Sequence, residues 1–169
     1  GGGRVAVFYD TMTMPTTGIL ARGGQYGTSA SAGTIYLKDN AQTYGDLIID
    51  NGNGVSSLTT PIRSAMTTFR SLTVRNRGRV NVSATENPVL TVQQPVVVSS
   101  NSELIVDSGS TFAVTKPSGF DLVVSSGSAL TLNAGVTWGV SPLQVDGGTL
   151  NASIDLSYAA GSDFQLTGN

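Results

Sequence analysis

The chain has 169 residues, of which 39% are hydrophobic and only 12% are charged, and it contains neither cysteine nor histidine. Disulfide bonds, catalysis by cysteine or histidine, and the common zinc sites are therefore excluded, because each needs those side chains. The net charge of −2 does not favour nucleic acid as a partner. The charge is unevenly spread: residues 1–79 hold eight Arg/Lys and four Asp/Glu, whereas residues 80–169 hold Lys116 and seven acids.

The N-terminal part, residues 1–54, is rich in glycine and tyrosine and carries short aliphatic segments. They begin at Val5 (VAV), Ile19 (ILARGG), Ile35 (IYLKDN) and Leu47 (LIIDNG). Each is typical of a short strand, because apolar side chains alternate with others before a turn-forming residue. We expect these segments to be rungs, a rung being one turn of a coiled chain. Residues 55–70 lack the pattern, which predicts an irregular connection, either a rung with a long loop or one short helix.

Residues 71–169 form a regular array, in which an aliphatic–x–aliphatic strand precedes a polar corner. First strands start at Leu72, Leu90, Leu104, Leu122, Leu143 and Phe164. Second strands read RVNV (79–82), VVV (96–98), TFAV (111–114), ALTL (129–132) and TLNAS (149–153). Because side chains alternate across a strand, Leu104 and Val106 face one side and Ile105 faces the other. The unit is therefore predicted to be strand, corner, strand, corner.

The recurring unit indicates the fold class. One rung cannot bury its inward face alone, whereas rungs stacked at about 4.8 Å build parallel sheets around a shared aliphatic core. We predict an all-β chain, a single β-solenoid over residues 1–169, with irregular rungs of about 18–25 residues. The absence of a strict hexapeptide repeat favours a right-handed parallel β-helix. A β-sandwich is the alternative, because its strands recur at similar spacing.

Part of the chain resembles a known kind of module. GGGRVAVFYD, GILARGG and SAGTIYLKDNAQTYGDLIIDNG, within residues 1–52, are similar to a recurring module of very large secreted bacterial proteins. The remaining residues resemble, in a general way, the β-helix regions of adhesins and pectin-lyase-like proteins. This resemblance implies a parallel β-helix at the cell surface or outside the cell. It implies no specific activity.

Enzymatic β-helices that cleave acidic polysaccharides need clustered carboxylates, often with Ca²⁺, and a basic residue. Asp50, Asp107 and Asp146 are interpreted as occupying one place in the repeat, directly after an aliphatic strand. Ser125 and Gln93 occupy that place in the intervening rungs, so the carboxylates are expected to be too far apart to share an ion. We therefore interpret them as turn formers, and expect no catalytic residue, metal or cofactor.

Four residues are candidates for binding a ligand or partner. Arg75, Arg77 and Arg79 form a basic cluster that suits an anionic glycan or an acidic protein surface, or is simply a solvated corner. Trp138, the one tryptophan, either stacks on a sugar or packs internally. Tyr26, Tyr36 and Tyr44 likewise suggest a stacked ladder or a sugar platform.

These observations favour a non-enzymatic structural or adhesive segment of an extracellular or cell-surface protein. Copies or neighbouring repeats are expected to associate end to end, because the charge asymmetry favours head-to-tail contacts that give fibres. A glycan-binding module, with cell-surface glycans as partners, and a polysaccharide lyase or hydrolase are the alternatives. No run of about 18 apolar residues occurs, so no membrane span is expected.

Overall fold

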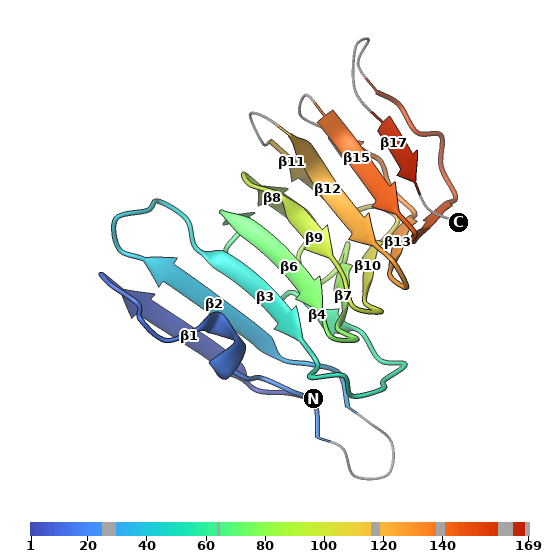
Figure 1. Ribbon diagram of the computed structural model, residues 1–169. Coiled ribbons are helices and arrows are strands. Elements are labelled where there is room, and N and C mark those ends of the chain that lie inside the picture. The colour runs from blue at the N-terminus through green and yellow to red at the C-terminus, as the bar shows by residue number, and fades with distance from the viewer. Residues whose placement is uncertain (25–29, 64, 116–118, 138–140, 159–163, 168–169) are drawn as a thin grey trace.

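A computed structural model describes residues 1–24, 30–63, 65–115, 119–137, 141–158 and 164–167. The chain is a β-solenoid of about four turns (Figure 1). Among these residues, no helix is both long and apolar enough to cross a membrane. The described residues contain one short helical turn, η1 (Thr16–Gly18).

Three sheets run along the solenoid. Sheet A contains β1 (Arg4–Tyr9), β2 (Thr34–Asp39), β3 (Asp46–Asp50), β6 (Ser71–Arg75), β9 (Val96–Val98), β12 (Phe120–Ser125), β15 (Ser141–Asp146) and β17 (Phe164–Thr167). Sheet B contains β4 (Thr60–Pro61), β7 (Arg79–Val82), β10 (Glu103–Val106), β13 (Ala129–Leu132) and β16 (Thr149–Ala152). Sheet C contains β5 (Thr68–Phe69), β8 (Val89–Val92), β11 (Thr111–Val114) and β14 (Val136–Thr137). From β3 to β16 the chain visits sheets A, B and C in turn.

The core is built from columns of side chains, in which each residue is the register partner of a residue in the next turn. In sheet A, one column runs through Leu47, Leu72, Val96, Leu122 and Leu143, each paired in parallel with its neighbour. All five side chains are at most 3% exposed. Burying an aliphatic side chain contributes roughly 1.5–3 kcal/mol, and a stacked column does so at every turn. The parallel, in-register pairing of successive turns excludes the β-sandwich. The predicted right-handed sense stays a prediction, which the general preference of parallel crossovers favours.

The corner between sheets A and B repeats the same backbone conformation in two successive turns. Asn76 and Arg77, and one turn later Ser100 and Asn101, all lie in the left-handed region, with φ from 52° to 61°. The Arg77 N–H donates to the Ser100 carbonyl at 2.9 Å, so the corners also stack. Left-handed backbone is least strained in glycine and in short polar residues such as asparagine. This explains the polar residues that follow the aliphatic strands.

Each full turn has three strands, so the predicted two-strand unit is wrong. The similar segments belong to different sheets. Sheet A contains strands within LIIDNG (from Leu47), LTVRNRG (from Leu72), LVVSSG (from Leu122), LQVDGG (from Leu143) and FQLTG (from Phe164). LIVDSG (from Leu104) includes β10 of sheet B, and LTVQQP (from Leu90) includes β8 of sheet C. The three sheets share one alternation of aliphatic and polar residues because all line one core. Self-similarity of sequence therefore cannot distinguish them. Register partners such as Leu122 and Leu143, or Val96 and Leu122, are 21 to 26 residues apart.

Residues 1–54, which we expected to form rungs, extend one sheet. β1 and β2 are parallel partners within sheet A, and β2 pairs with β3 in antiparallel fashion. No strand of sheet B or C lies between them in the described chain. A second core cluster forms on their outer face, where Ile19 and Ala21 pack with Ile35, Leu37 and Ile48. Sheet A therefore projects two strands beyond sheets B and C at this end (Figure 1).

The connection predicted at residues 55–70 contains two very short strands, β4 and β5. They pair in parallel with β7 and β8 and complete the first turn. Thr60, in β4, donates from Oγ1 to the carbonyl of Ala32 at 2.7 Å, which joins this turn to the N-terminal part. Of the two alternatives that the sequence left open, this matches a rung with a long loop, and two-residue strands are too short to show alternation in the sequence.

Candidate functional site

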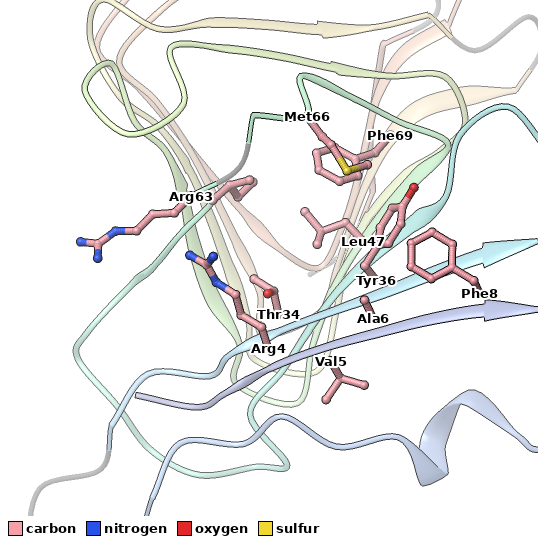
Figure 2. Close-up of a pocket in the computed structure, with 11 residues that line it drawn as sticks. Arg4, Val5, Ala6, Phe8, Thr34, Tyr36, Leu47, Arg63, Met66 and Phe69 are labelled. Atoms are coloured by element: carbon pink, nitrogen blue, oxygen red, sulfur yellow. The ribbon is translucent and has the colours of Figure 1, made fainter.

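The projecting part of sheet A leaves a hollow at the N-terminal end of the core, which we call the end pocket. Its volume is about 280 Å³. The inner faces of β1 and β2 form one wall, and Ile62, Arg63 and Met66, between β4 and β5, form the other (Figure 2). The core side chains Leu47 and Ile62 lie at its base. The pocket therefore opens where the column of stacked aliphatic side chains stops.

An aromatic row lines one side of the end pocket. The rings of Phe8 and Tyr36 meet edge to face at 5.9 Å between centroids, and those of Tyr36 and Phe69 at 6.1 Å. Phe8 is 65% exposed and Met66, beside the row, is 40% exposed, whereas Phe69 is buried. Edge-to-face pairs of this kind stabilise an aromatic cluster. The exposed rings leave an apolar surface that a ligand can cover.

Two arginines line the opposite side of the end pocket (Figure 2). Arg63 forms an ion pair with Glu86 at 2.9 Å, with both side chains well exposed. Arg4, at the start of β1, is exposed and has no ion pair among the described residues. The end pocket thus combines an apolar side with a side of net positive charge.

The predicted basic cluster is divided by the structure. Arg75 Nε lies 2.7 Å from Asp50 Oδ2, and the two side chains are only 19% and 4% exposed. Asp50 also accepts from the Gly52 N–H at 2.8 Å and from the Asn76 amide. Burial raises the pKa of Asp50, but these hydrogen bonds and the Arg75 charge outweigh it and lower the pKa below its ordinary value. Arg75 therefore has a structural role.

Arg79 is also engaged. Its Nε donates to Glu103 Oε2 at 2.7 Å, and its Nη1 donates to the carbonyl of Ser57. Arg77 differs, because it is exposed and lines a shallow hollow of about 230 Å³. That hollow is also lined by Val55, Asn101 and Arg79. Of the three arginines, Arg77 is the exposed one and the one without an ion pair among the described residues.

Trp138 and Tyr26 lie outside the described residues. Tyr36 belongs to the aromatic row of the end pocket, and Tyr44 is half-buried in the loop before β3, apart from that row. Among the described residues, therefore, Tyr36 and Tyr44 do not form a stacked ladder.

The three aspartates do not occupy one place in the repeat, which corrects our interpretation. Asp50 and Asp146 end strands of sheet A, and Asp107 follows a strand of sheet B, where it accepts from the Asn81 amide at 2.9 Å. Asp50 pairs with Arg75 in register and Asp146 pairs with Ser125. Over the described chain, no three Asp or Glu side chains come together in a way that would hold a metal ion.

Sequence reasoning missed the end pocket. Its signal was present in RVAVFY, where alternation places Arg4, Ala6 and Phe8 on one face and Val5 and Val7 on the other. The aliphatic residues suggested an ordinary core face. The structure shows instead that Val5 and Val7 pack on the second core cluster, so the face with the arginine and the phenylalanine is the inner one.

Comparisons with known proteins give no relative. A scan against protein-family models, a search of curated proteins and a search of solved structures each returned no match.

Proposed function

We propose that the chain is a non-enzymatic structural or adhesive segment of an extracellular or cell-surface protein. The observation that supports this is the unbroken column of buried aliphatic side chains from Leu47 to Leu143. A column of this kind holds a shape along the solenoid axis, which suits a spacer or a support for binding surfaces. The resemblance of residues 1–52 to modules of secreted bacterial proteins supports the location.

Ion pairs between successive turns support the same role. Arg70 pairs with Asp46, Arg75 with Asp50, and Arg79 with Glu103, each pair linking residues 24 or 25 positions apart. Such pairs join one turn to the next outside the core. They resist sliding of the turns, which a load-carrying segment requires.

Location is tested by labelling intact cells of the source organism with antibodies raised against the purified chain. We expect labelling without permeabilisation. Labelling that needs permeabilised cells would reject the extracellular location. Enzyme activity is tested separately on pectate-like, alginate-like and neutral polysaccharides with Ca²⁺ present. Release of shortened products would replace the structural role with the lyase or hydrolase alternative.

End-to-end association of copies is part of the proposal. The excess of positive charge in residues 1–79 and of negative charge in residues 80–169 favours contact between opposite ends. In the described chain, β1 and β17 are the outermost strands of sheet A, and β1 runs against the direction of β17. Strand pairing between copies would therefore be antiparallel in sheet A. Sedimentation at rising concentration tests this, and a strict monomer at every salt concentration would reject it.

Glycan binding is a second candidate because Arg77 is exposed beside a hollow. A guanidinium binds carboxylates and sulfates of acidic glycans through paired hydrogen bonds. On a glycan array, the chain should bind acidic glycans and Arg77→Ala should lose that binding. An absence of binding to any acidic glycan, or unchanged binding by Arg77→Ala, would reject this candidate.

A further inference from the structure

The inner face of β1 differs from those of β3, β6, β9 and β12, which carry buried aliphatic side chains. In register, Ala6 pairs with Tyr36 and Tyr36 pairs with Leu47, whose side chain belongs to the core. Because side chains alternate, Arg4 and Phe8 share the face of Ala6. The column that is aliphatic through the turns therefore ends beside an arginine.

An arginine at this place decides what the end pocket can hold. Burying a charge without a partner costs several kcal/mol. A further dry, aliphatic layer over this face would bury Arg4 in that way. The face therefore suits an occupant that brings its own negative charge.

The charges around the end pocket also set the charge of that occupant. Glu86 neutralises Arg63 through an ion pair at 2.9 Å. Arg4 is the other charged residue that lines the pocket, and it has no ion pair among the described residues. The unpaired charge of Arg4 would be neutralised by a ligand that carries one carboxylate.

The aromatic side of the end pocket determines the polarity of the uncharged part of the ligand. Phe8 and Tyr36 present ring surface, and Phe8 is 65% exposed. Few hydrogen-bonding groups besides the arginines line the cavity, Thr34 and the Tyr36 hydroxyl among them. A sugar ring would leave most of its hydroxyl groups without partners, which costs binding energy. An apolar or aromatic body fits better.

We propose that the end pocket binds a small amphiphilic carboxylate, with its apolar body against Phe8 and Tyr36 and its carboxylate at Arg4. Arg4 and Phe8 are four residues apart in a strand, which spans about 13 Å. The cavity of about 280 Å³ is near the lower end for ligand pockets. It therefore suits a single small molecule, such as an aromatic acid, rather than a polymer. The proposal does not rest on the structural role, but the end pocket lies on the end face that end-to-end association would cover. A bound carboxylate and a stacked copy would therefore compete for this face.

The test is a methyl NMR titration of the whole chain with 3-phenylpropionate. We expect saturable shifts confined to methyl groups that line the pocket, those of Ala6, Leu47, Ile62 and Met66, with Kd on the order of 1 mM. The neutral 3-phenylpropanol should bind about ten-fold more weakly, because it lacks the charge-assisted hydrogen bond. Galacturonate, which has the charge but a polar body, should also bind more weakly.

Variants locate the two halves of the site. Arg4→Gln should weaken 3-phenylpropionate binding about ten-fold, and Arg4→Lys should recover part of it. Phe8→Ala should weaken binding of both the acid and the alcohol. Arg22→Gln is the matched control, because Arg22 is an exposed arginine of the same end that does not line the pocket. Arg22→Gln should bind like the unaltered chain.

Several outcomes would overturn the proposal. They are an absence of saturable shifts, shifts spread over the outer faces of the turns, tighter binding of galacturonate than of 3-phenylpropionate, or equal losses in Arg4→Gln and Arg22→Gln. Folding of each variant is checked in the same spectra through the methyl groups of Leu104 and Leu130, which are fully buried in sheet B.

Discussion

The stacked turns and the N-terminal part, which forms β1 and β2, share one alternating strand pattern but bury opposite faces of it. We call the N-terminal part the extension. In the turns, alternate side chains such as Leu122 and Val124 fill the central core, and Val123 between them faces outward. In the extension, Ile35 and Leu37 of β2 face outward and pack with Met12, Ile19 and Ala21, whereas Tyr36 lines the open end pocket. The comparison teaches that strand alternation marks two faces but does not say which one becomes core. Tertiary neighbours decide that.

The largest expected effect is in the core of the turns. Leu122→Ala removes a fully buried side chain from the central column and should lower the free energy of unfolding by about 3 kcal/mol. Val123→Ala, at the next residue but on the outer face, should cost less than about 1 kcal/mol. Urea denaturation measures both. Equal losses would mean that the two faces of β12 are buried alike.

The second-largest effect on stability tests whether the extension unfolds separately from the turns. Asn51 is buried, accepts from the Gly23 N–H at 3.1 Å and donates to the Gly54 carbonyl at 2.7 Å. Asn51→Ala should cost about 2 kcal/mol, since both backbone groups lose a buried partner. Hydrogen exchange should quicken at Ile35 and Leu37 before it quickens in the turns. Exchange that rises uniformly would show that the two regions unfold as one unit.

A smaller effect is expected on lowering the pH. The pKa of Asp50 is lowered in the folded chain, so the unfolded chain binds a proton more readily at acid pH. Asp50 therefore stabilises the fold above the ordinary carboxyl pKa of about 3.9, and this contribution is lost as the pH falls through the folded-state pKa. Thermal unfolding of Asp50→Asn should depend less on pH between about 5 and 3 than that of the unaltered chain. An unchanged pH dependence would show that Asp50 does not contribute.

The smallest effect compares two arginines two residues apart. Arg79→Gln removes an ion pair that joins two turns, with the side chains 29% and 22% exposed, and should cost about 0.5–1 kcal/mol. Arg77→Gln should leave stability unchanged within about 0.5 kcal/mol, because Arg77 is exposed. Both values come from urea denaturation. A greater loss in Arg77→Gln would mean that this side chain also supports the fold.

The fold class was predictable because the repeated aliphatic pairs required stacking. The number of strands in a turn was not predictable, since Leu104 in sheet B and Leu122 in sheet A stand in nearly identical sequence surroundings. The functions of the arginines were partly hidden for another reason. The partners of Arg75 and Arg79 are Asp50 and Glu103, each a full turn away in sequence, and the register that joins them follows from the coiling.

The central claim is that successive turns lie directly over one another in parallel register. The chain has no native cysteine, so paired cysteine variants report this directly on the outer face of sheet A, where Val97 is the register partner of Val123 and Val123 is that of Gln144. Oxidation of the double variant Val97→Cys, Val123→Cys should give an intramolecular disulfide, because neighbouring strands are about 4.8 Å apart. The double variant Val97→Cys, Gln144→Cys, two strands apart at about 10 Å, should stay reduced. Failure of the first pair to close, or closure of the second, would contradict the stacked solenoid.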